Sequence, residues 1–245
     1  MSLFLKYCLL LFVMNEAVAN SLRFTSNEAQ TTLIELYTSE GCSSCPPADE
    51  FLNQFTNSDE LWNQYIPMAF HVDYWDYIGW QDSFATASHS NRQRKHQQQG
   101  NISSVYTPGF VVNGEEWTGF FKAWRTLPEF NQFPGQLEII INRHSATISY
   151  PKAQQKYQYN LVILGMGLTT EVTNGENSGR KLQHDFVVLN HQTQSGQSST
   201  TLNLPLIMDH NPKQFAVVAW ITTPESMQPI QAVGGLLPSG SIKSI

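Results

Sequence analysis

The chain has 245 residues, of which 41% are hydrophobic and 14% are charged, and its formal net charge is −6. This apolar content supports a packed core and excludes global disorder. The acidic balance is unlike the basic face of a general nucleic-acid binder, so we expect no nucleic-acid partner. The length suits one large domain or two small ones.

The N-terminus predicts a secretion signal. Lys6 gives a short positive start, residues 7–14 are mainly apolar, and Ala17-Val18-Ala19 is a small-residue cleavage pattern. The apolar stretch is much shorter than the roughly 20 residues needed to span a bilayer. We therefore expect residues 1–19 to be a cleaved signal peptide. The mature protein is expected to be periplasmic or secreted and not to span a membrane.

A close cysteine pair follows the first predicted strand. Residues 32–37 are rich in apolar and β-favouring side chains, and residues 48–55 repeat apolar side chains at helical spacing. Cys42-Ser43-Ser44-Cys45 lies between them, and Cys8 would be removed with the signal. A disulfide that closes so short a loop stabilises a fold little. The pair therefore indicates a redox site rather than a staple.

A second buried strand is expected at residues 66–72, which makes a βαβ unit with parallel strands. A helical insertion is expected at about 74–105. The basic residues of this insertion are interpreted as a solvated helix face; the alternative is that they lie over the thiols and favour the thiolate form. They are Arg92, Arg94, Lys95 and His96.

Asn113-Gly114 between two strand-like runs predicts a β-hairpin. The dipeptide Thr107-Pro108 precedes this hairpin and suits a cis peptide bond; the alternative is an ordinary trans proline that starts a strand. Residues 120–130 are expected to form a closing helix. We place this α/β domain at residues 20–131.

The chain beyond residues 131–135 changes character. Short runs of alternating apolar side chains are separated by turns rich in Asn, Gly, Ser and Pro. This pattern predicts a β-rich domain at residues 135–240, arranged as an antiparallel sandwich. Its sequence does not decide between partner binding and dimerisation.

Disulfide exchange needs an attacking thiolate and a second thiol that resolves the mixed disulfide. Cys42 is expected where a helix begins, where unpaired N–H groups and the helix dipole stabilise an anion. Such placement can lower a cysteine pKa from ~8.5 to ~3.5–7.5. Cys42 is therefore predicted to be the nucleophile and Cys45 the resolving thiol, with no cofactor beyond their disulfide.

Two other functions remain open. His71 is expected near the carboxyl end of the second strand, where ligands gather in open α/β sheets. Two thiolates and this imidazole would suit Cu(I), as in a copper-binding or copper-delivery protein. A simpler interpretation is that His71 and Asp73 hydrogen-bond to each other or to the backbone. The third hypothesis is a redox-inert binding module. Asn177, Arg180 and His184 form no recognisable metal or triad pattern.

The order of predicted elements resembles the thioredoxin fold over about residues 31–130. Four segments resemble the DUF1223 family of secreted bacterial proteins, which is described as thioredoxin-like and of unknown function. They are residues 36–49, 70–80, 106–108 and 175–180. In thioredoxin-type proteins a proline like Pro108 abuts the cysteine pair and its neighbouring backbone binds an extended peptide. The resemblance therefore implies that Thr107 and Pro108 shape a peptide groove.

The chain departs from ordinary thioredoxin in several ways. Gly41 replaces the usual tryptophan, no lysine follows Cys45, and Leu36 stands where thioredoxin has a buried aspartate. Glu35 is one position away, on the opposite strand face. It is a candidate proton acceptor for Cys45 if the strand is bulged, and otherwise a structural carboxylate. Despite these departures, the cysteine pair between a strand and a helix and the Thr107-Pro108 dipeptide predict a thiol–disulfide oxidoreductase. It is expected to act on protein or peptide thiols and to use a redox partner protein.

Overall fold

A computed structural model describes residues 21–122, 125–205, 207 and 210–241. The expected signal peptide lies outside the described residues. Among the residues that are described, no helix is both long and apolar enough to cross a membrane.

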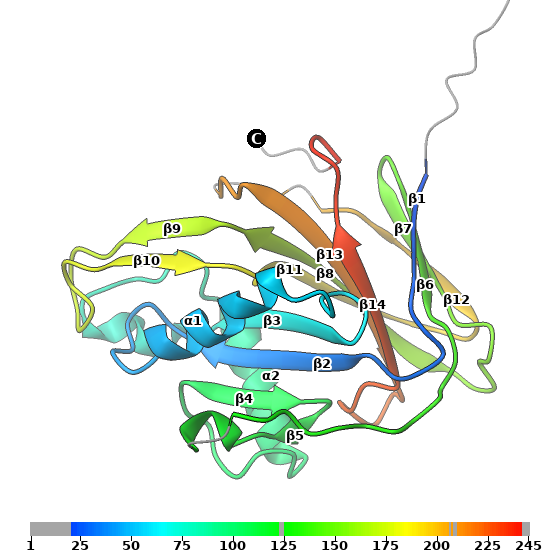
Figure 1. Ribbon diagram of the computed structural model, residues 1–245, viewed down its shortest axis with the longest axis horizontal. Helices are drawn as coiled ribbons and strands as arrows, with labels where there is room; N and C mark the ends of the chain where they lie inside the picture. The colour runs from blue at the N-terminus through cyan, green and yellow to red at the C-terminus, as the bar shows by residue number, and fades with distance from the viewer. Residues whose placement is uncertain (1–20, 123–124, 206, 208–209, 242–245) are drawn as a thin grey trace, which may run out of the picture.

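An eight-stranded mixed sheet forms the centre of the molecule, in the order β14-β13-β8-β11-β3-β2-β4-β5 (Figure 1). Its strands are β2 (Thr32–Thr38), β3 (Tyr65–His71), β4 (Gly109–Val112), β5 (Glu115–Glu116), β8 (Tyr157–Met166), β11 (Val187–Gly196), β13 (Gln214–Thr222) and β14 (Gln231–Leu236). β3 pairs in parallel with both β2 and β11, and the other pairings are antiparallel. β2 and β3 are buried along nearly their whole length, as strands covered on both faces require.

A second, antiparallel sheet has the order β1-β6-β7-β12. Its strands are β1 (Leu22–Thr25), β6 (Glu138–Asn142), β7 (Ser145–Ser149) and β12 (Ser199–Asn203). Alternate residues of β6, such as Ile139 and Ile141, join Ile163 and Val217 of the large sheet in one buried apolar cluster. Burial of this face holds the two sheets together. The β-rich fold predicted for this part of the chain is thus confirmed.

Two α-helices cover opposite faces of the large sheet near β2 and β3 (Figure 1). The first is α1 (Pro46–Asn53), whose apolar side chains at Ala48 and Leu52 join the main core. The second is α2 (Ala87–Gln98), which begins with Thr86 as a side-chain cap for the His89 N–H. The buried residues of α2 are polar: His89, Ser90, Gln93 and His96. Short 3-10 helices occur at Gln54–Asn57, Asp73–Ile78 and Gly119–Phe121.

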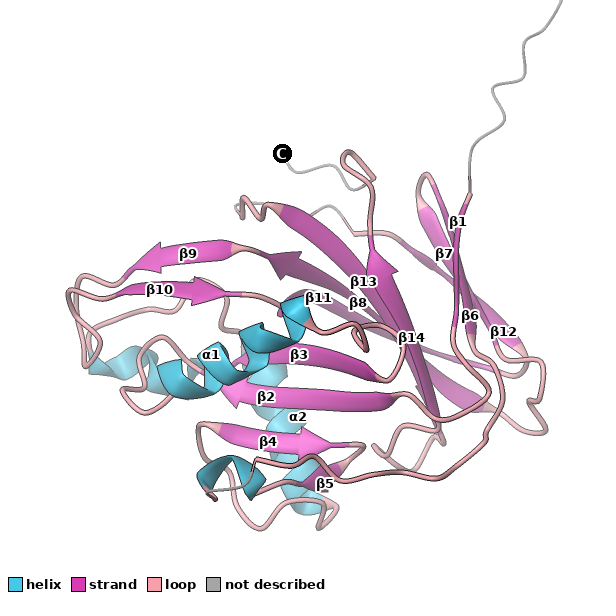
Figure 2. Ribbon diagram, viewed as in Figure 1, coloured by secondary structure: helices cyan, strands magenta, loops and turns pink. Residues whose placement is uncertain are grey.

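A two-stranded hairpin of β9 (Leu168–Glu171) and β10 (Lys181–His184) projects beyond the large sheet and lies along α1 (Figure 2). Asn53 at the end of α1 fixes this position. Its side-chain amide donates to the Gln183 carbonyl at 3.0 Å, and its oxygen accepts from the Asp185 N–H at 3.0 Å. The hairpin therefore brings the second half of the chain to the helix that follows the cysteine pair.

Several local predictions are confirmed and one is wrong. The strands at 32–37 and 66–72 and the Asn113-Gly114 turn are observed, and helical segments occur within the predicted insertion. The closing helix at 120–130 is wrong, because only Gly119–Phe121 forms a 3-10 turn and residues 125–134 have no regular structure. Pro128 contributes to this, since it lacks an N–H and restricts the residue before it. The large sheet runs across the predicted boundary at 131–135, since β11 pairs with β3.

Candidate functional site

The cysteine pair occupies the turn between β2 and α1. Cys42 and Cys45 form a disulfide with their Cα atoms 5.4 Å apart, and Cys45 directly precedes the first helical residue. The Cys45 N–H donates to the Cys42 carbonyl at 3.2 Å, which closes the turn. Both cysteines are buried, whereas Ser43 and Ser44 between them are exposed.

Few backbone donors remain free at the start of α1. Pro46 and Pro47 have no N–H, and the N–H groups of Ala48 and Asp49 both donate to the Cys45 carbonyl. The Ser44 hydroxyl lies 3.3 Å from the Cys42 sulfur. The set of unpaired N–H groups that the sequence led us to expect beside Cys42 is therefore reduced, and the nearest polar group to its sulfur among these residues is the Ser44 hydroxyl.

The Thr107-Pro108 peptide bond is cis, as predicted. Trp75 connects this bond to the cysteine turn. Its indole N–H donates to the Thr107 hydroxyl at 2.7 Å, and a Cβ atom placed on Gly41 would lie only 3.1 Å from the Trp75 Cβ. The absence of a side chain at Gly41 thus lets one tryptophan contact both segments.

A loop from the second half of the chain covers the cysteine turn. We call residues 172–180, between β9 and β10, the cover loop. The buried Asn177 donates from its amide nitrogen to the Glu40 carbonyl at 2.8 Å and the Cys42 carbonyl at 3.0 Å. The Ser43 N–H donates to the Glu176 carboxylate at 3.1 Å. Residues 175–180 carried part of the family resemblance, but no sequence signal placed them on the cysteines.

Five ionisable side chains form a buried group beside this turn. We call Glu40, Asp49, His71, Asp82 and His184 the histidine–carboxylate cluster; each is at most 7% exposed. The residues come from the β2–α1 turn, α1, β3, the segment before α2, and β10. Sequence analysis selected only His71 among them.

Hydrogen bonds fix two of the carboxylates. Asp82 accepts from the His71 Nδ1 at 2.7 Å and from the backbone N–H groups of Glu40 and Phe84, each at 2.9 Å. Glu40 accepts from the Trp80 indole at 2.8 Å. The His184 Nε2 lies 3.2 Å from the second Glu40 oxygen, at ion-pair distance but without hydrogen-bond geometry.

The remaining carboxylate, Asp49, accepts from the Thr38 hydroxyl at 3.1 Å. Burial raises its pKa above the ordinary value, and the nearby His184 and His71 offset this only in part. By contrast, burial would lower the pKa of His71, but the adjacent Asp82 carboxylate outweighs burial and raises it to about 9. Asp49 is thus the carboxyl group in the cluster whose protonation is favoured.

Glu35 has a different environment. Arg92 donates to both of its oxygens at 2.8 and 2.7 Å, the Tyr37 hydroxyl donates at 2.8 Å, and His96 Nε2 lies 3.4 Å away. Burial alone would raise the Glu35 pKa, but Arg92 and His96 hold it well below the ordinary value. The β2–β3 register is regular along all of β2, so no bulge turns Glu35 toward the cysteines. Glu35 therefore has the surroundings of a structural carboxylate.

The basic residues of α2 divide into two pairs. Arg94 and Lys95 are exposed, as a solvated face requires, but Arg92 and His96 turn inward to Glu35. The expectation that all four form a solvated face is therefore wrong. The reason is electrostatic, because a buried carboxylate on β2 needs a positive partner.

His71 and Asp73 do not bond to each other. His71 pairs with Asp82, while Asp73 accepts from the Ser90 hydroxyl. The copper site considered from the sequence requires both cysteines as thiolates, so it stays a hypothesis for the reduced form of the pair that is a disulfide here. The free Nε2 of His71 instead belongs to a group with Asp49 and His184, whose potential ligand atoms lie within 4.8 Å of one another.

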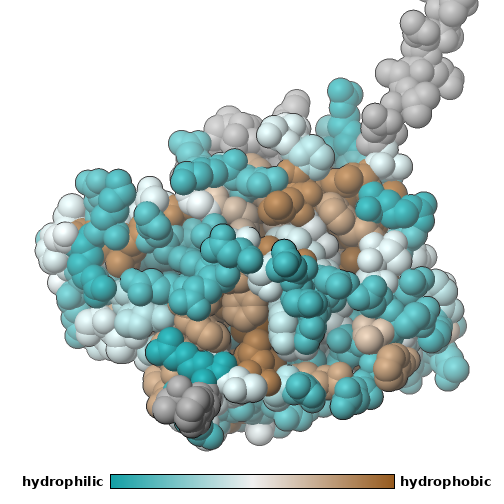
Figure 3. All heavy atoms as spheres, in the orientation of Figure 1, coloured by the Kyte–Doolittle hydropathy of each residue, from teal (hydrophilic) through white to brown (hydrophobic). Residues whose placement is uncertain are grey.

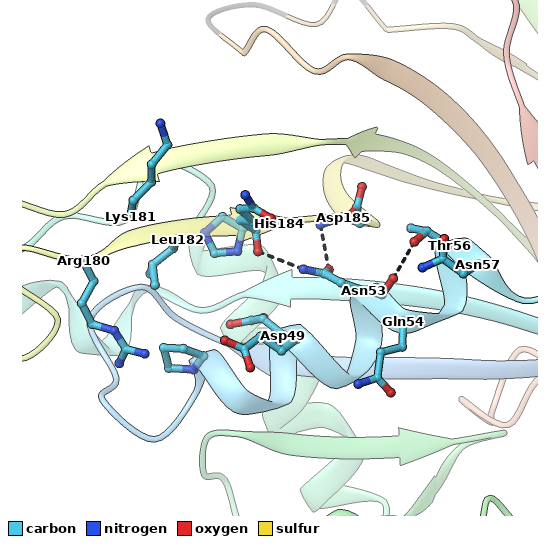
Figure 4. A pocket seen from close by; sticks show the side chains of 13 residues that line it. Asp49, Asn53, Gln54, Thr56, Asn57, Arg180, Lys181, Leu182, His184 and Asp185 are labelled. Carbon is cyan, nitrogen blue, oxygen red and sulfur yellow. Dashed lines mark hydrogen bonds between the residues drawn. The ribbon is translucent and has the colours of Figure 1, made fainter.

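A cleft of about 440 Å³ opens between α1 and β10. Asp49 and His184 face each other across it, with Asn53 on one side and Arg180 on the other (Figure 4). The surface over α1 and the β9–β10 hairpin is mainly hydrophilic (Figure 3). The cluster is therefore buried but borders a polar cleft.

Comparisons with known proteins point to a family and a fold. Residues 33–222 match the family model DUF1223, "Protein of unknown function". The crystal structure of protein AGR_C_4864 from Agrobacterium tumefaciens is similar, with a TM-score of 0.59 and 21% identity over 89% of this chain and 98% of that one. HBP35 of Porphyromonas gingivalis is also similar, with a TM-score of 0.50 and 13% identity over 89% and 79% of the two chains. At these identities both structures indicate the fold alone. A search of curated proteins found no match.

Proposed function

The chain belongs to the DUF1223 family, whose function is unknown, and we propose that it is a thiol–disulfide oxidoreductase acting on protein or peptide thiols. The observation that carries the proposal is the Cys42–Cys45 disulfide at the start of α1. A pair three residues apart can open and close without moving the chain far. Because it closes a short loop, it stabilises the fold little, which favours a chemical role.

We also propose that residues 31–130 form a thioredoxin-like arrangement. β2, α1 and β3 form a βαβ unit with parallel strands, and the β4–β5 hairpin pairs antiparallel with β2. The cis bond at Thr107-Pro108 directly precedes β4. We propose that an extended substrate segment binds beside this bond, with the protein working in the periplasm or outside the cell.

In the proposed reaction the reduced Cys42 thiolate attacks one sulfur of a substrate disulfide. A mixed disulfide forms, and the other substrate sulfur leaves as a thiolate. The Cys45 thiolate then attacks the Cys42 sulfur, so the protein disulfide closes and the second substrate thiol is released. Two electrons pass from the protein to the substrate, and a redox partner protein restores the dithiol. The same steps in reverse oxidise a substrate.

Asp49 is the proposed proton acceptor for Cys45. The two residues are four positions apart, so they lie on one face of the helix start, and the Asp49 N–H donates to the Cys45 carbonyl at 3.1 Å. Its raised pKa suits a group that takes a proton and returns it. Glu35 is less suited, because its depressed pKa and its pairing with Arg92 keep it ionised.

Substrate access requires a change in the cover loop. Cys42 is only 1% exposed, and Asn177 and Glu176 hydrogen-bond to the Cys42 carbonyl and the Ser43 N–H that follow its sulfur in the chain. Attack needs a collinear approach of a third sulfur, which the closed arrangement does not admit. We therefore propose that the β9–β10 hairpin opens before exchange.

An insulin-reduction assay with dithiothreitol as electron donor tests the proposal. The wild-type protein should accelerate insulin precipitation, and Cys42→Ser should remove that acceleration. Cys45→Ser is the matched variant: it should also fail to turn over but should accumulate a mixed disulfide through Cys42, detectable by mass spectrometry. No acceleration by the wild type, with no trapped adduct in Cys45→Ser, would favour the redox-inert binding module.

A further inference from the structure

Three members of the histidine–carboxylate cluster have an arrangement that disulfide exchange does not explain. Asp49 of α1, His71 of β3 and His184 of β10 converge from separate elements, and all three are buried. One potential ligand atom from each lies within 4.8 Å of the others. We call these residues the Asp49–His71–His184 triad.

Both imidazoles of the triad carry buried nitrogens without a hydrogen-bond partner. They are Nε2 of His71 and both ring nitrogens of His184, in side chains that are 1% and 2% exposed. An unsatisfied buried polar group costs about 1–3 kcal/mol, and native structures contain few of them. Two such side chains directed at one carboxylate indicate that a ligand completes the group.

The surrounding residues are those that commonly orient histidine ligands. Asp82 holds the Nδ1 of His71 at 2.7 Å, which leaves Nε2 directed into the triad. Glu40 lies at ion-pair distance, 3.2 Å, from the Nε2 of His184, so we assign the Nδ1 as the ligand atom, although neither nitrogen has a hydrogen bond in this arrangement. Metal-bound histidines usually have such a carboxylate on the other ring nitrogen.

The balance of charge points the same way. Three carboxyl groups, of Glu40, Asp49 and Asp82, are buried with only two imidazoles. An ionised carboxylate is strongly disfavoured away from water unless a cation neutralises it, so Asp49 is stable here either protonated or beside a bound divalent cation. The donor set of two nitrogens and one carboxylate oxygen is one that Zn²⁺ accepts with a fourth position left for another ligand.

We infer that the triad binds one divalent transition-metal ion, with Zn²⁺ as the best match, through an Asp49 oxygen, the His71 Nε2 and the His184 Nδ1. Zn²⁺ ligands at about 2.0–2.2 Å from the ion lie about 3.3 Å from one another, so small side-chain rotations that draw the three atoms closer than their present limit of 4.8 Å complete the site. Asp49 and His184 both line the cleft between α1 and β10, so a further ligand could reach the ion from that cleft (Figure 4). The inference uses neither sulfur, but it gives a second role to Asp49, the proposed proton acceptor for Cys45.

Zinc titration of the oxidised mature protein tests the inference. The protein is stripped with EDTA, and thiol titration verifies that the disulfide is closed, so that no thiolate contributes. Calorimetry should then give about one Zn²⁺ per chain, and the ion should raise the melting temperature, because it binds the folded state. Co²⁺ should give the visible absorption of a nitrogen- and oxygen-ligated site.

Variants distinguish this site from a surface site. Asp49→Asn and His184→Gln should each lower Zn²⁺ affinity at least about 100-fold, and Asp82→Asn should lower it about 10–100-fold through loss of ligand orientation. His191→Gln is the matched control, because His191 is a largely covered imidazole bonded to Asn160 outside the cluster. Its affinity should equal that of the wild type.

The inference is overturned if the oxidised wild type shows no saturable uptake up to about 100 µM Zn²⁺. It is equally overturned if Asp49→Asn binds as tightly as the wild type, or if binding appears only after reduction, which would place the ion on the cysteines. Asp49→Asn keeps the side-chain shape and its bond from Thr38, so it serves even if His184→Gln fails to fold. Insulin reduction is measured separately, so either proposal can fail alone.

Discussion

Two buried charged groups lie close to β2 and β3, and they differ in how completely they are paired. Between β2 and α2, Glu35 receives two bonds from Arg92 and one from Tyr37, and the Arg92 guanidinium also packs against the rings of Phe70 and Trp220, 5.2 Å from each centroid. In the same group the His96 Nε2 lies 3.4 Å from Glu35 and is its one imidazole nitrogen without a hydrogen bond. At the ends of β2 and β3, the histidine–carboxylate cluster leaves three imidazole nitrogens without hydrogen bonds, one of His71 and two of His184.

This difference separates a structural role from a chemical one. A buried ion pair whose members satisfy each other contributes to a single well-defined packing and has no free position for a ligand. A buried group with open positions retains a cost that only a ligand or a reaction removes. The Glu35–Arg92 pair therefore belongs to the scaffold, and the cluster beside the cysteines belongs to the site.

The largest expected effect comes from breaking the paired group. Arg92→Met should lower the free energy of unfolding by about 3–5 kcal/mol, because it leaves the Glu35 carboxylate buried without its cation. Urea unfolding at pH 7 of the metal-free protein measures this, with Asp49→Asn as the comparison. Asp49→Asn should lower stability by less than about 1 kcal/mol, since its amide oxygen can still accept from Thr38. Equal losses in the two variants would contradict the distinction between scaffold and site.

Low pH should lower the free energy of unfolding through protonation of His191. Burial lowers the pKa of this imidazole to about 3, and the Arg92 charge acts in the same direction. In the unfolded chain this imidazole takes up a proton near pH 6.5, whereas in the folded chain it does so only near pH 3. The contribution of neutral His191 to the free energy of unfolding is therefore fully present above pH 6.5 and is lost as the pH falls toward 3.

His191→Gln should remove this contribution. Between pH 6.5 and 4 the wild type should lose about 1–2 kcal/mol more than the variant, a figure reduced because the side chain is partly exposed and therefore screened. Urea midpoints measured across this range provide the test. Parallel pH profiles for the two proteins would show that His191 protonates as easily when folded as when unfolded.

The smallest effect is expected at the cover loop. Asn177→Ala removes two hydrogen bonds from the cover loop to the backbone of Glu40 and Cys42. The free energy needed to open the loop should fall by about 1 kcal/mol. Reduction of the native disulfide by dithiothreitol should therefore become about fivefold faster. Asn174→Ala is the control in the same loop, because its side chain bonds only to its neighbour Thr173. An unchanged rate in Asn177→Ala would show that the loop does not limit access.

Local features could be predicted from the sequence, whereas the meeting of distant segments could not. The strand before Cys42, the Asn113-Gly114 turn and the cis bond at Pro108 each depend on neighbouring residues. The cluster depends on Asp49 and His184, which lie 135 positions apart (184 − 49). Strand periodicity identifies a strand but not its partners, so the pairing of β11 with β3 had no local signal.

The polar buried face of α2 explains why its four basic residues were wrongly predicted to form a solvated face. Its buried face carries His89, Ser90, Gln93 and His96, so a rule that assigns apolar side chains to the core interprets this helix as solvated. The corresponding signal in the sequence was Glu35 in an otherwise apolar strand, since a buried carboxylate requires a cationic partner elsewhere.

A redox titration of the oxidised protein in glutathione buffers, run in parallel with and without urea, tests most directly whether Cys42 and Cys45 exchange electrons in the folded state. We predict reversible two-electron reduction of the native protein, with a potential above about −300 mV, in the range of catalytic pairs. A potential below that value, with reduction only at urea concentrations that unfold the chain, would contradict the assignment and leave the disulfide a structural bond.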